Sequence, residues 1–159
     1  MKLKKLKTHL FFALANLPMS GWTRSRFIRW GGVQFDGKKV FIGKDVAFDT
    51  MYPQNIHIGN GVHITAGVNI LTHYLNTDGG EMWRSGHVYI GDYTFIGTGT
   101  IISKDVHIGN HCIIGAGSVI TKDIPDWEIW AGNPARFIKK KTPWVWETPS
   151  VYEASVSQE

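Results

Sequence analysis

The sequence contains very little that could cross-link the chain or carry it through a membrane. It has 159 residues and one cysteine, Cys112, which excludes a disulfide framework within the chain and a metal site built from several cysteines. No run approaches the roughly 18 apolar residues of a membrane-spanning helix. Only 6 residues are proline, whereas 18 are glycine, and these glycines follow neither a collagen period nor a low-complexity tract. With 43% hydrophobic and 19% charged residues, the chain is expected to form one domain.

Acidic residues are almost missing from the N-terminal segment. Residues 1–39 hold nine lysines and arginines against a single acid, Asp36, so this segment carries +8 while the remainder carries −4. A basic pole of this kind indicates an anionic surface or ligand near the N-terminus. No nucleic-acid recognition motif follows it, so nucleic acid is not expected as a partner.

Residues 1–17 predict a short amphipathic helix, because leucine and phenylalanine recur on one face at helical spacing. Its apolar run is shorter than that of a secretory signal peptide, so a cytoplasmic protein is expected. The helix could cover the open end of the main body, or residues 1–30 could make peripheral contact with the anionic inner face of a membrane. We favour the cap, because a short helix with four lysines is a weak anchor by itself. The residues that would assist membrane contact are Lys2, Lys4, Lys5, Lys7, Trp22, Arg24, Arg26, Arg29 and Trp30.

A six-residue repeat dominates the rest of the chain. From 90 to 125 it reads IGDYTF, IGTGTI, ISKDVH, IGNHCI, IGAGSV, ITKDIP, with isoleucine in every first place and mostly small or β-branched residues in the fifth. The same frame appears over 58–75 and 42–47. Because side chains alternate along an extended chain, the first and fifth places point to one side, which we expect to be the interior. Glycine-containing pairs mark bends, so three short strands should close one triangular coil.

The sextets therefore predict an all-β prism of about four stacked coils, whose strands pair along the axis at about 4.8 Å. Two stretches break the frame: residues 76–89 are expected to leave the prism as a loop, and the first coil is short around Pro53. Function is expected at such irregularities on a rigid scaffold. The expected divisions are a basic helical segment over 1–35, the prism with its loop over 36–138, and a tail over 139–159, in which Trp144 and Trp146 should pack on the body or on a neighbour.

Several segments resemble the hexapeptide-repeat acyltransferases: ILTHYLNTDGG, VYIGDYTFIGTGTIIS, IIGAGSVITKDIP and AGNPARFIKK. The similarity runs over about 40–141 and is greatest to the sugar O-acetyltransferases, such as those acting on maltose, galactosides and capsular or lipopolysaccharide sugars. It implies a left-handed parallel β-helix with acetyl-CoA as co-substrate and no metal. It also implies a homotrimer with active sites between neighbouring subunits and a sugar or glycan as acceptor.

Transfer of an acetyl group from a thioester to a sugar hydroxyl needs a base, and histidine suits that task near neutral pH. His73 stands where the repeat breaks into the loop, and its Thr-His pair is similar to the family's catalytic position. We expect His73 to act as general base while the acceptor attacks the acetyl carbon directly, without an acetyl-enzyme. Backbone N–H groups would stabilise the oxyanion.

Candidate acceptor contacts lie in the two irregular stretches. Asp49 is similar in place to the polar residue with which the family holds the acceptor, and it could bind sugar hydroxyls, orient an imidazole or simply form a turn before Pro53. In the loop, Asn76, Trp83 and Arg84 could close over the acceptor, with Trp83 as a stacking surface for a sugar ring.

The resemblance also places coenzyme A along the outside of the prism, between subunits. Arg136 could meet the coenzyme phosphates through its forked donors. Family enzymes often carry tryptophan where this chain has Phe95. The positions matching the thioester end are Phe95, Thr98 and Gly99, and those along the arm and adenine are Ala116, Gly117, Ser118, Thr121 and Lys122.

Two other classes are weighed against this interpretation. A zinc enzyme similar to γ-class carbonic anhydrases would use three histidines between subunits, and His73, His107 and His111 invite that comparison. This zinc enzyme is disfavoured because His73 is in the fourth place of its sextet and His107 in the sixth, and because a loop between them is not expected in that class. A non-catalytic scaffold for envelope polysaccharide assembly is the other alternative, which the presence of His73, the loop and GNPAR disfavours. The sequence leaves open the acceptor, the length of the acyl group and the choice between oxygen and nitrogen.

Overall fold

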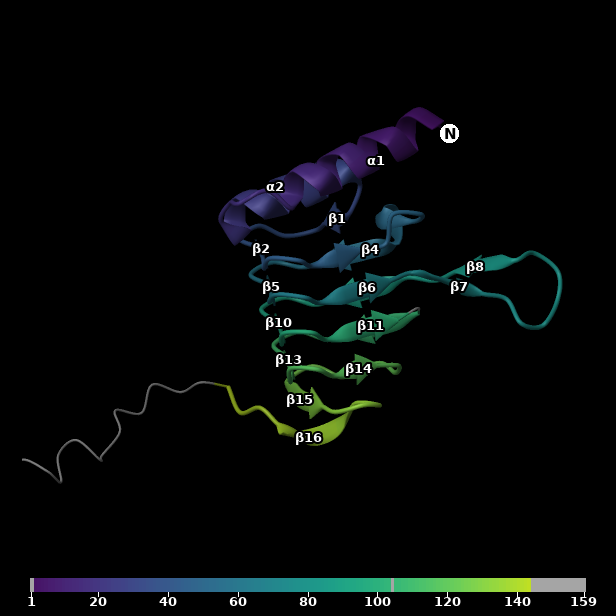
Figure 1. The fold of residues 1–159 in the computed structure, drawn as a ribbon. Helices are drawn as coiled ribbons and strands as arrows, with labels where there is room; N and C mark the ends of the chain where they lie inside the picture. Colours follow the sequence, from purple (N-terminus) through teal and green to yellow (C-terminus); the bar gives the residue numbers. More distant parts are fainter. Residues whose placement is uncertain (1, 104, 144–159) are drawn as a thin grey trace, which may run out of the picture.

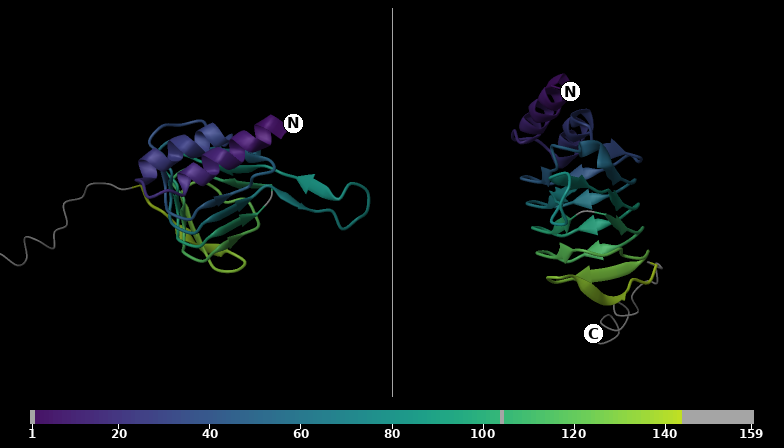
Figure 2. Two further views of the ribbon diagram at one scale, coloured as in Figure 1. Left: turned by 45° about the horizontal axis from the view of Figure 1, so that its top comes forward. Right: turned by 90° about the vertical axis from the view of Figure 1, so that its right-hand side faces the viewer.

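Three parallel sheets form the walls of a triangular prism, and two helices lie across one of its ends (Figure 1). The computed structural model describes residues 2–103 and 105–143, so the part of the expected tail that holds Trp144 and Trp146 lies outside the described residues. Each turn of the chain contributes one strand to each wall, as the views in Figure 2 show.

From residue 34 to residue 120, the strands of the three walls follow one another in rotation, apart from one excursion of the chain, and the final two strands both join the second wall. The first wall contains β1 (Gln34–Phe35), β4 (Ile56–Ile58), β9 (Val88–Ile90) and β12 (Val106–Ile108). The second contains β2 (Phe41–Ile42), β5 (His63–Ile64), β10 (Phe95–Ile96), β13 (Ile113–Ile114), β15 (Glu128–Ala131) and β16 (Arg136–Lys140). The third contains β3 (Ala47–Phe48), β6 (Asn69–Leu71), β11 (Ile101–Ser103) and β14 (Val119–Ile120).

The interior is the side of the strands that the repeat predicts. In all six sextets from 90 to 125, the residues in the first and fifth places are buried, with exposed fractions of 2% or less. Strand register stacks isoleucine on isoleucine, as with Ile64, Ile96 and Ile114 in the second wall. Cys112 is buried among them, as expected for a small inward residue, and burial raises the pKa of its thiol.

Both ends of the prism extend further than the sextet frame indicates. β1 already pairs in parallel with β4, so the first wall begins at Gln34 rather than at the first isoleucine sextet. At the other end, β15 pairs with β13 although it follows Pro125, and β16 adds to β15 in the antiparallel direction. This last strand runs across the boundary that we placed after residue 138.

The N-terminal segment contains two helices where the leucine pattern predicts one. α1 (Lys2–Ala15) is followed by α2 (Gly21–Gly31), which begins after Ser20, whose hydroxyl accepts a hydrogen bond from the Thr23 N–H. α2 packs on β2, and Phe12 of α1 contacts Phe48 of β3 with ring centroids 6.0 Å apart. The helices thus lie over the first coil.

Arg24 fastens α2 to the structure beneath it. Its guanidinium donates hydrogen bonds to the carbonyl oxygens of Ala15 (2.8 Å), Ile42 (2.9 Å) and Met19 (3.2 Å), and the residue is buried. The expectation that Arg24 assists membrane contact is therefore wrong, because its charge is enclosed by the protein's own carbonyl groups.

Candidate active site

The excursion from the prism is a β-hairpin that projects from one corner (Figure 1). β7 (His73–Leu75) pairs in the antiparallel direction with β8 (Trp83–Ser85), so the chain leaves the prism at His73, three residues before the loop that the repeat predicts. The Gly86 N–H donates to the Thr72 carbonyl at 2.7 Å and closes the base of the hairpin. His73 is thus the first residue of the excursion.

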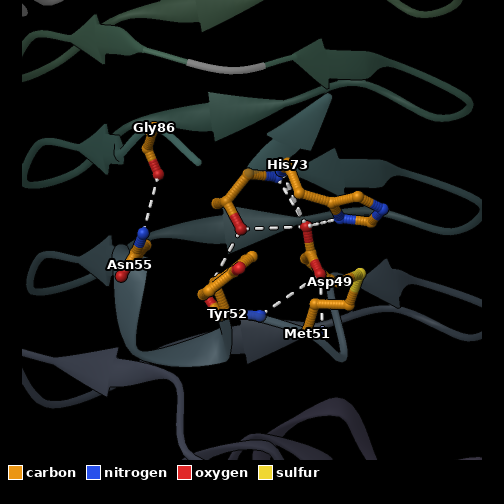
Figure 3. Close-up of polar contacts among 7 residues, drawn as sticks. Asp49, Met51, Tyr52, Asn55, His73 and Gly86 are labelled. Atoms are coloured by element: carbon orange, nitrogen blue, oxygen red, sulfur yellow. Dashed lines mark hydrogen bonds and ion pairs between the residues drawn. The ribbon is translucent and has the colours of Figure 1, made fainter. Parts of the chain in front are cut away.

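The other irregular stretch lies beside this base. After β3, the chain bulges through residues 49–52 into a single 3-10 turn, η1 (Pro53–Asn55), before it rejoins the first wall. The Asn55 side chain is buried and donates from Nδ2 to the Gly86 carbonyl at 3.0 Å (Figure 3). The two irregular stretches are therefore joined by a hydrogen bond, which the separate motifs did not indicate.

Asp49 and His73 form the centre of this arrangement (Figure 3). The Asp49 Oδ2 atom accepts from the His73 ring nitrogen Nδ1 at 2.5 Å, from the His73 N–H at 3.0 Å, and from the Thr72 N–H and hydroxyl at 2.8 and 2.9 Å. The other carboxylate oxygen, Oδ1, accepts from the Met51 N–H at 2.8 Å. Both oxygens of Asp49 are thus occupied within the chain.

These hydrogen bonds determine the charge of Asp49. Burial by itself raises the pKa of the carboxyl, but the hydrogen bonds from the His73 ring and from the Thr72 and Met51 N–H groups outweigh it, and the net pKa lies below its ordinary value. Asp49 is therefore ionised at neutral pH, with its charge held against the imidazole.

An ionised carboxylate can only accept hydrogen bonds, so Nδ1 of His73 carries the hydrogen that they share. In the neutral ring, the second nitrogen, Nε2, is then unprotonated and able to accept a proton. The His73 side chain is 25% exposed, whereas that of Asp49 is 0% exposed. This arrangement presents an oriented base at the surface of the prism.

The structure corrects our placing of Asp49 among the acceptor-binding residues. Its side chain has no exposed surface, and its oxygens already accept hydrogen bonds from His73, Thr72 and Met51. Of the roles considered, those of orienting the imidazole and of forming the turn agree with the geometry. Thr72 and Asn55 are polar residues of the site that the sequence did not single out. Thr72 occupies the third place of its sextet, a place that is not buried at any described position of the regular sextets, so the repeat gave no signal of its burial.

The hairpin candidates have different surroundings. Trp83 is 42% exposed and meets the His73 ring edge-on, with centroids 5.3 Å apart, so it stands where a ligand of His73 would pass. Arg84 is exposed and lies 3.6 Å from the Asp78 carboxylate. The Asn76 side chain donates to the carbonyls of Gly79 (2.6 Å) and Glu81 (3.0 Å), so it shapes the tip of the hairpin rather than facing His73.

The donor candidates divide between two corners of the prism. Thr98, Gly99, Ala116 and Gly117 stack at the corner between the second and third walls, where the Gly117 N–H donates to the Thr98 carbonyl at 2.8 Å. Thr121 and Lys122 follow β14 at the corner between the third and first walls, the corner at which His73 leaves β6. A three-residue strand of about 10 Å separates the two corners.

Glycine keeps the first of these corners open. Gly99 and Gly117 both have positive φ, at +68° and +67°, and an added Cβ would meet no atom within 4 Å. Ser118 is different, because its side chain is fully buried and its hydroxyl donates to the Gly115 carbonyl at 2.6 Å. Ser118 is therefore able to bind the coenzyme only through its backbone, not through its hydroxyl.

The remaining donor candidates lie on the second wall. Phe95, on β10, is 42% exposed. Arg136 begins β16, is exposed, and donates from Nη1 to the neighbouring Ala135 carbonyl at 3.0 Å. Both side chains are thus open to a ligand on this face.

The three histidines of the zinc alternative have separate surroundings. His73 pairs with Asp49, His107 lies beside Tyr89 with ring centroids 5.9 Å apart, and His111 stacks on Trp127 at 4.0 Å. Within residues 2–103 and 105–143, histidine, cysteine and acidic side chains form no group of three that could hold a metal ion.

Comparisons with known proteins agree with the resemblance. The family model of the bacterial transferase hexapeptide (six repeats) matches residues 87–122. Protein CapG of Staphylococcus aureus is 43% identical in an alignment over 121 residues, with 70% of this chain and 68% of CapG covered. The chain belongs to the bacterial hexapeptide transferases. It is thus a transferase built on the hexapeptide repeat, as the resemblance implies.

Solved structures place this hexapeptide transferase beside acetyltransferases. A maltose O-acetyltransferase from Clostridium difficile 630 has a TM-score of 0.70 and 28% identity, with 89% of this chain and 88% of that chain covered. A galactoside acetyltransferase in complex with coenzyme A has a TM-score of 0.68 and 25% identity, with 89% and 82% covered. Both of these relatives are named for the transfer of an acetyl group to a sugar.

Proposed function

We propose that this hexapeptide transferase moves an acetyl group from acetyl-CoA to a hydroxyl of a saccharide, with His73 as general base. The observation that carries the proposal is the Asp49–His73 pair at the base of the hairpin, in which a buried carboxylate orients a partly exposed imidazole. We further propose that the prism is left-handed and has about four coils, as in the acyltransferases that it resembles.

The chemistry follows from the free nitrogen of His73. As the acceptor oxygen bonds to the acetyl carbon, its proton passes to Nε2, and the ionised Asp49 stabilises the imidazolium that forms. The carbon–sulfur bond then breaks, and the leaving thiolate takes the proton back from the ring. One base therefore serves both halves of the transfer, and no acetyl-enzyme is needed.

A homotrimer would bring the two halves of the site together. Within one chain, the open glycine corner at Gly99 and Gly117 is separated by the third wall from the corner of His73. A coenzyme arm lying along the glycine corner of one chain would reach the His73 of a neighbouring chain, not its own. Phe95, Ala116, Thr121, Lys122 and Arg136 would complete this groove. Acetyl-CoA as co-substrate is consistent with a cytoplasmic site of action.

A saccharide acceptor fits the surroundings of His73. The exposed Trp83 ring beside the imidazole offers an apolar face on which a sugar ring can stack, and Arg84 lies next to it on β8. The two solved relatives act on maltose and on galactosides by name, which supports a sugar hydroxyl as the nucleophile.

An acceptor screen with radiolabelled acetyl-CoA tests the proposal. We expect label to pass to at least one mono- or oligosaccharide, and the His73→Ala variant to lose nearly all transfer while keeping the oligomeric state of the wild type. Transfer that survives in His73→Ala would overturn the mechanism. A protein that releases no acetyl group to any sugar or to water would favour the scaffold alternative, and stoichiometric zinc in the purified protein would revive the hydratase.

A further inference from the structure

The apolar row of α1 points away from the prism. On its inner side, the buried Thr8 hydroxyl donates to the Gly31 carbonyl at 2.8 Å, and Phe12 contacts Phe48. The leucines lie on the opposite side: Leu3 is 84% exposed, Leu6 66% and Leu10 54%. The residues that would be expected to pack an amphipathic helix against a core are thus left in contact with solvent.

The exposed surface continues from α1 onto α2. Phe11 of α1 meets Trp30 of α2 with ring centroids 5.6 Å apart, and the Lys7 ammonium lies 6.0 Å from the Phe11 ring. Trp30 is itself 51% exposed, and Trp22 on the same helix is 48% exposed. Phe11 and Trp30 therefore join the two helices, and each helix carries large exposed apolar side chains.

Cations lie beside the two tryptophans of α2. Next to Trp30, a groove of about 450 Å³ opens between α2 and the loop that precedes β2. No carboxylate in the described parts of the chain lies within ion-pair distance of the positive charges that line it. The aromatic and basic side chains that line this groove and would contact a ligand are Trp22, Arg26, Arg29, Trp30, Lys38 and Lys39.

We propose that this outer helix face, made of Leu3, Leu6, Leu10, Trp22 and Trp30 with the cations around them, binds the surface of a membrane that contains anionic phospholipid. Leucine and tryptophan would enter the boundary between headgroups and acyl chains, while lysine and arginine contact the lipid phosphates. No helix among the described residues is long and apolar enough to cross a bilayer, so the contact proposed is with the surface.

Charge selects lipid over a second copy of this chain as the occupant. Residues 1–39 carry +8, so pairing two outer helix faces would bring two strongly positive surfaces together. An anionic bilayer neutralises the same charge and buries the same leucines. The contact is independent of the acetyl transfer proposed above, because none of its residues belongs to that site.

Flotation of the full-length protein with vesicles tests the proposal. Vesicles of phosphatidylcholine and phosphatidylglycerol in equal amounts should carry the protein upward, whereas vesicles of phosphatidylcholine alone should carry much less. The double variant Leu6→Ser/Leu10→Ser should weaken the partition about tenfold or more, because it removes two apolar side chains from the contact. Arg26→Gln and Lys39→Gln should each weaken it about fivefold, and added salt should do the same for the wild type.

Matched controls come from surfaces away from the two helices. Ile138→Ser changes an aliphatic residue of β16 that is 57% exposed at the opposite end of the prism, and Lys140→Gln removes an exposed cation from the same strand. Both variants should float like the wild type. Quenching of tryptophan fluorescence by brominated lipid gives a second readout, and it should fall in Trp22→Phe/Trp30→Phe.

Three outcomes would overturn the proposal. Equal flotation with both kinds of vesicle would remove the role of anionic lipid. Release of the bound protein by millimolar glycerol phosphate would identify a site for a soluble phosphate instead. A wild type that is a larger oligomer than Leu6→Ser/Leu10→Ser in the absence of lipid would show that a second copy covers the outer helix face.

Discussion

The regular sextets over 90–125 and the broken coil around Asp49 and His73 use inward-pointing residues in opposite ways. In the regular part, inward hydroxyl groups donate to main-chain carbonyls, as when the Thr100 hydroxyl donates to the Gly97 carbonyl, three residues earlier, at 2.7 Å. In the broken coil, a buried carboxylate bonds to residues more than twenty positions further along the chain. The repeat therefore supplies stability, and its interruption supplies a buried, ionised carboxylate that orients a partly exposed imidazole.

The largest expected effect concerns the imidazole that only the broken coil presents. His73→Ala should lower kcat about a thousandfold, because general base catalysis contributes about 10²- to 10⁴-fold. Steady-state kinetics with the acceptor found by screening measures this. His107→Ala, which removes an exposed histidine from a regular strand, should keep the wild-type kcat. A loss of kcat in His107→Ala as large as that in His73→Ala would mean that the broken coil has no special role in catalysis.

Within the regular part, burial alone should determine the cost of a substitution. Ile102 is 0% exposed and its neighbour on β11, Ile101, is 38% exposed. Ile102→Ala should lower the free energy of unfolding by about 3 kcal/mol through lost burial and a residual cavity, whereas Ile101→Ala should lower it by under about 1 kcal/mol. Chemical denaturation of the two variants measures the difference. Equal losses of unfolding free energy in Ile101→Ala and Ile102→Ala would mean that β11 does not turn Ile102 inward and Ile101 outward.

Asp49→Asn should weaken both catalysis and stability. Without the charge, the ring of His73 loses its fixed tautomer and the imidazolium loses its partner, so kcat should fall about tenfold to a hundredfold. Because folding lowers the pKa of Asp49 below its ordinary value of 3.8, its charge stabilises the wild type above about pH 4, and that contribution disappears as pH falls through the lowered pKa.

The gap in unfolding free energy between wild type and Asp49→Asn should therefore narrow as pH decreases below about 4. Urea titrations at several pH values measure it. Asp45→Asn, at a carboxylate whose side chain is 67% exposed, serves as control and should show no comparable narrowing. A gap that stays constant down to acid pH would mean that Asp49 is not stabilised by its charge.

The smallest effect should come from the glycine corner. Gly117→Ala places a Cβ in open space at φ +67°, so it should cost about 1 kcal/mol of strain and raise the KM for acetyl-CoA a few-fold by obstructing the approach of the coenzyme arm. Gly79→Ala, at φ +87° in the hairpin tip with the same open surroundings, should cost a similar strain and leave that KM unchanged. Equal KM values for acetyl-CoA in Gly117→Ala and Gly79→Ala would mean that the coenzyme does not bind at this corner.

The sequence predicts the regular part almost completely, because period and burial are local properties of the repeat. Every inward place over 90–125 follows from counting in sixes, but the count fails only at residue 76, three residues after the chain has left the prism at His73. What it could not supply is the contact between stretches far apart in the chain. Asn55 meets Gly86, and Asp49 meets His73, only because successive coils stack.

The N-terminal helices show a second limit. Helical spacing correctly groups the leucines on one side of α1, but spacing does not say which side the rest of the molecule covers. The buried positions of the two helices are determined by the shape of the first coil and by the carbonyl groups that Arg24 reaches; they are Thr8, Ala15, Gly21, Arg24, Ile28 and Gly31. Ser20 and the glycines at 31–32 were the local signals for the second helix.

The hairpin leaves the prism and returns without disturbing the strands on either side of it. β9 pairs with β4 in the same register that β12 keeps with β9, with Ile58 opposite Ile90 and Ile90 opposite Ile108. Residues between β7 and β8 can thus be lengthened, shortened or exchanged with no demand on the stack. New acceptor preferences could evolve here by variation of one appendage while the folding of the scaffold stays as it is.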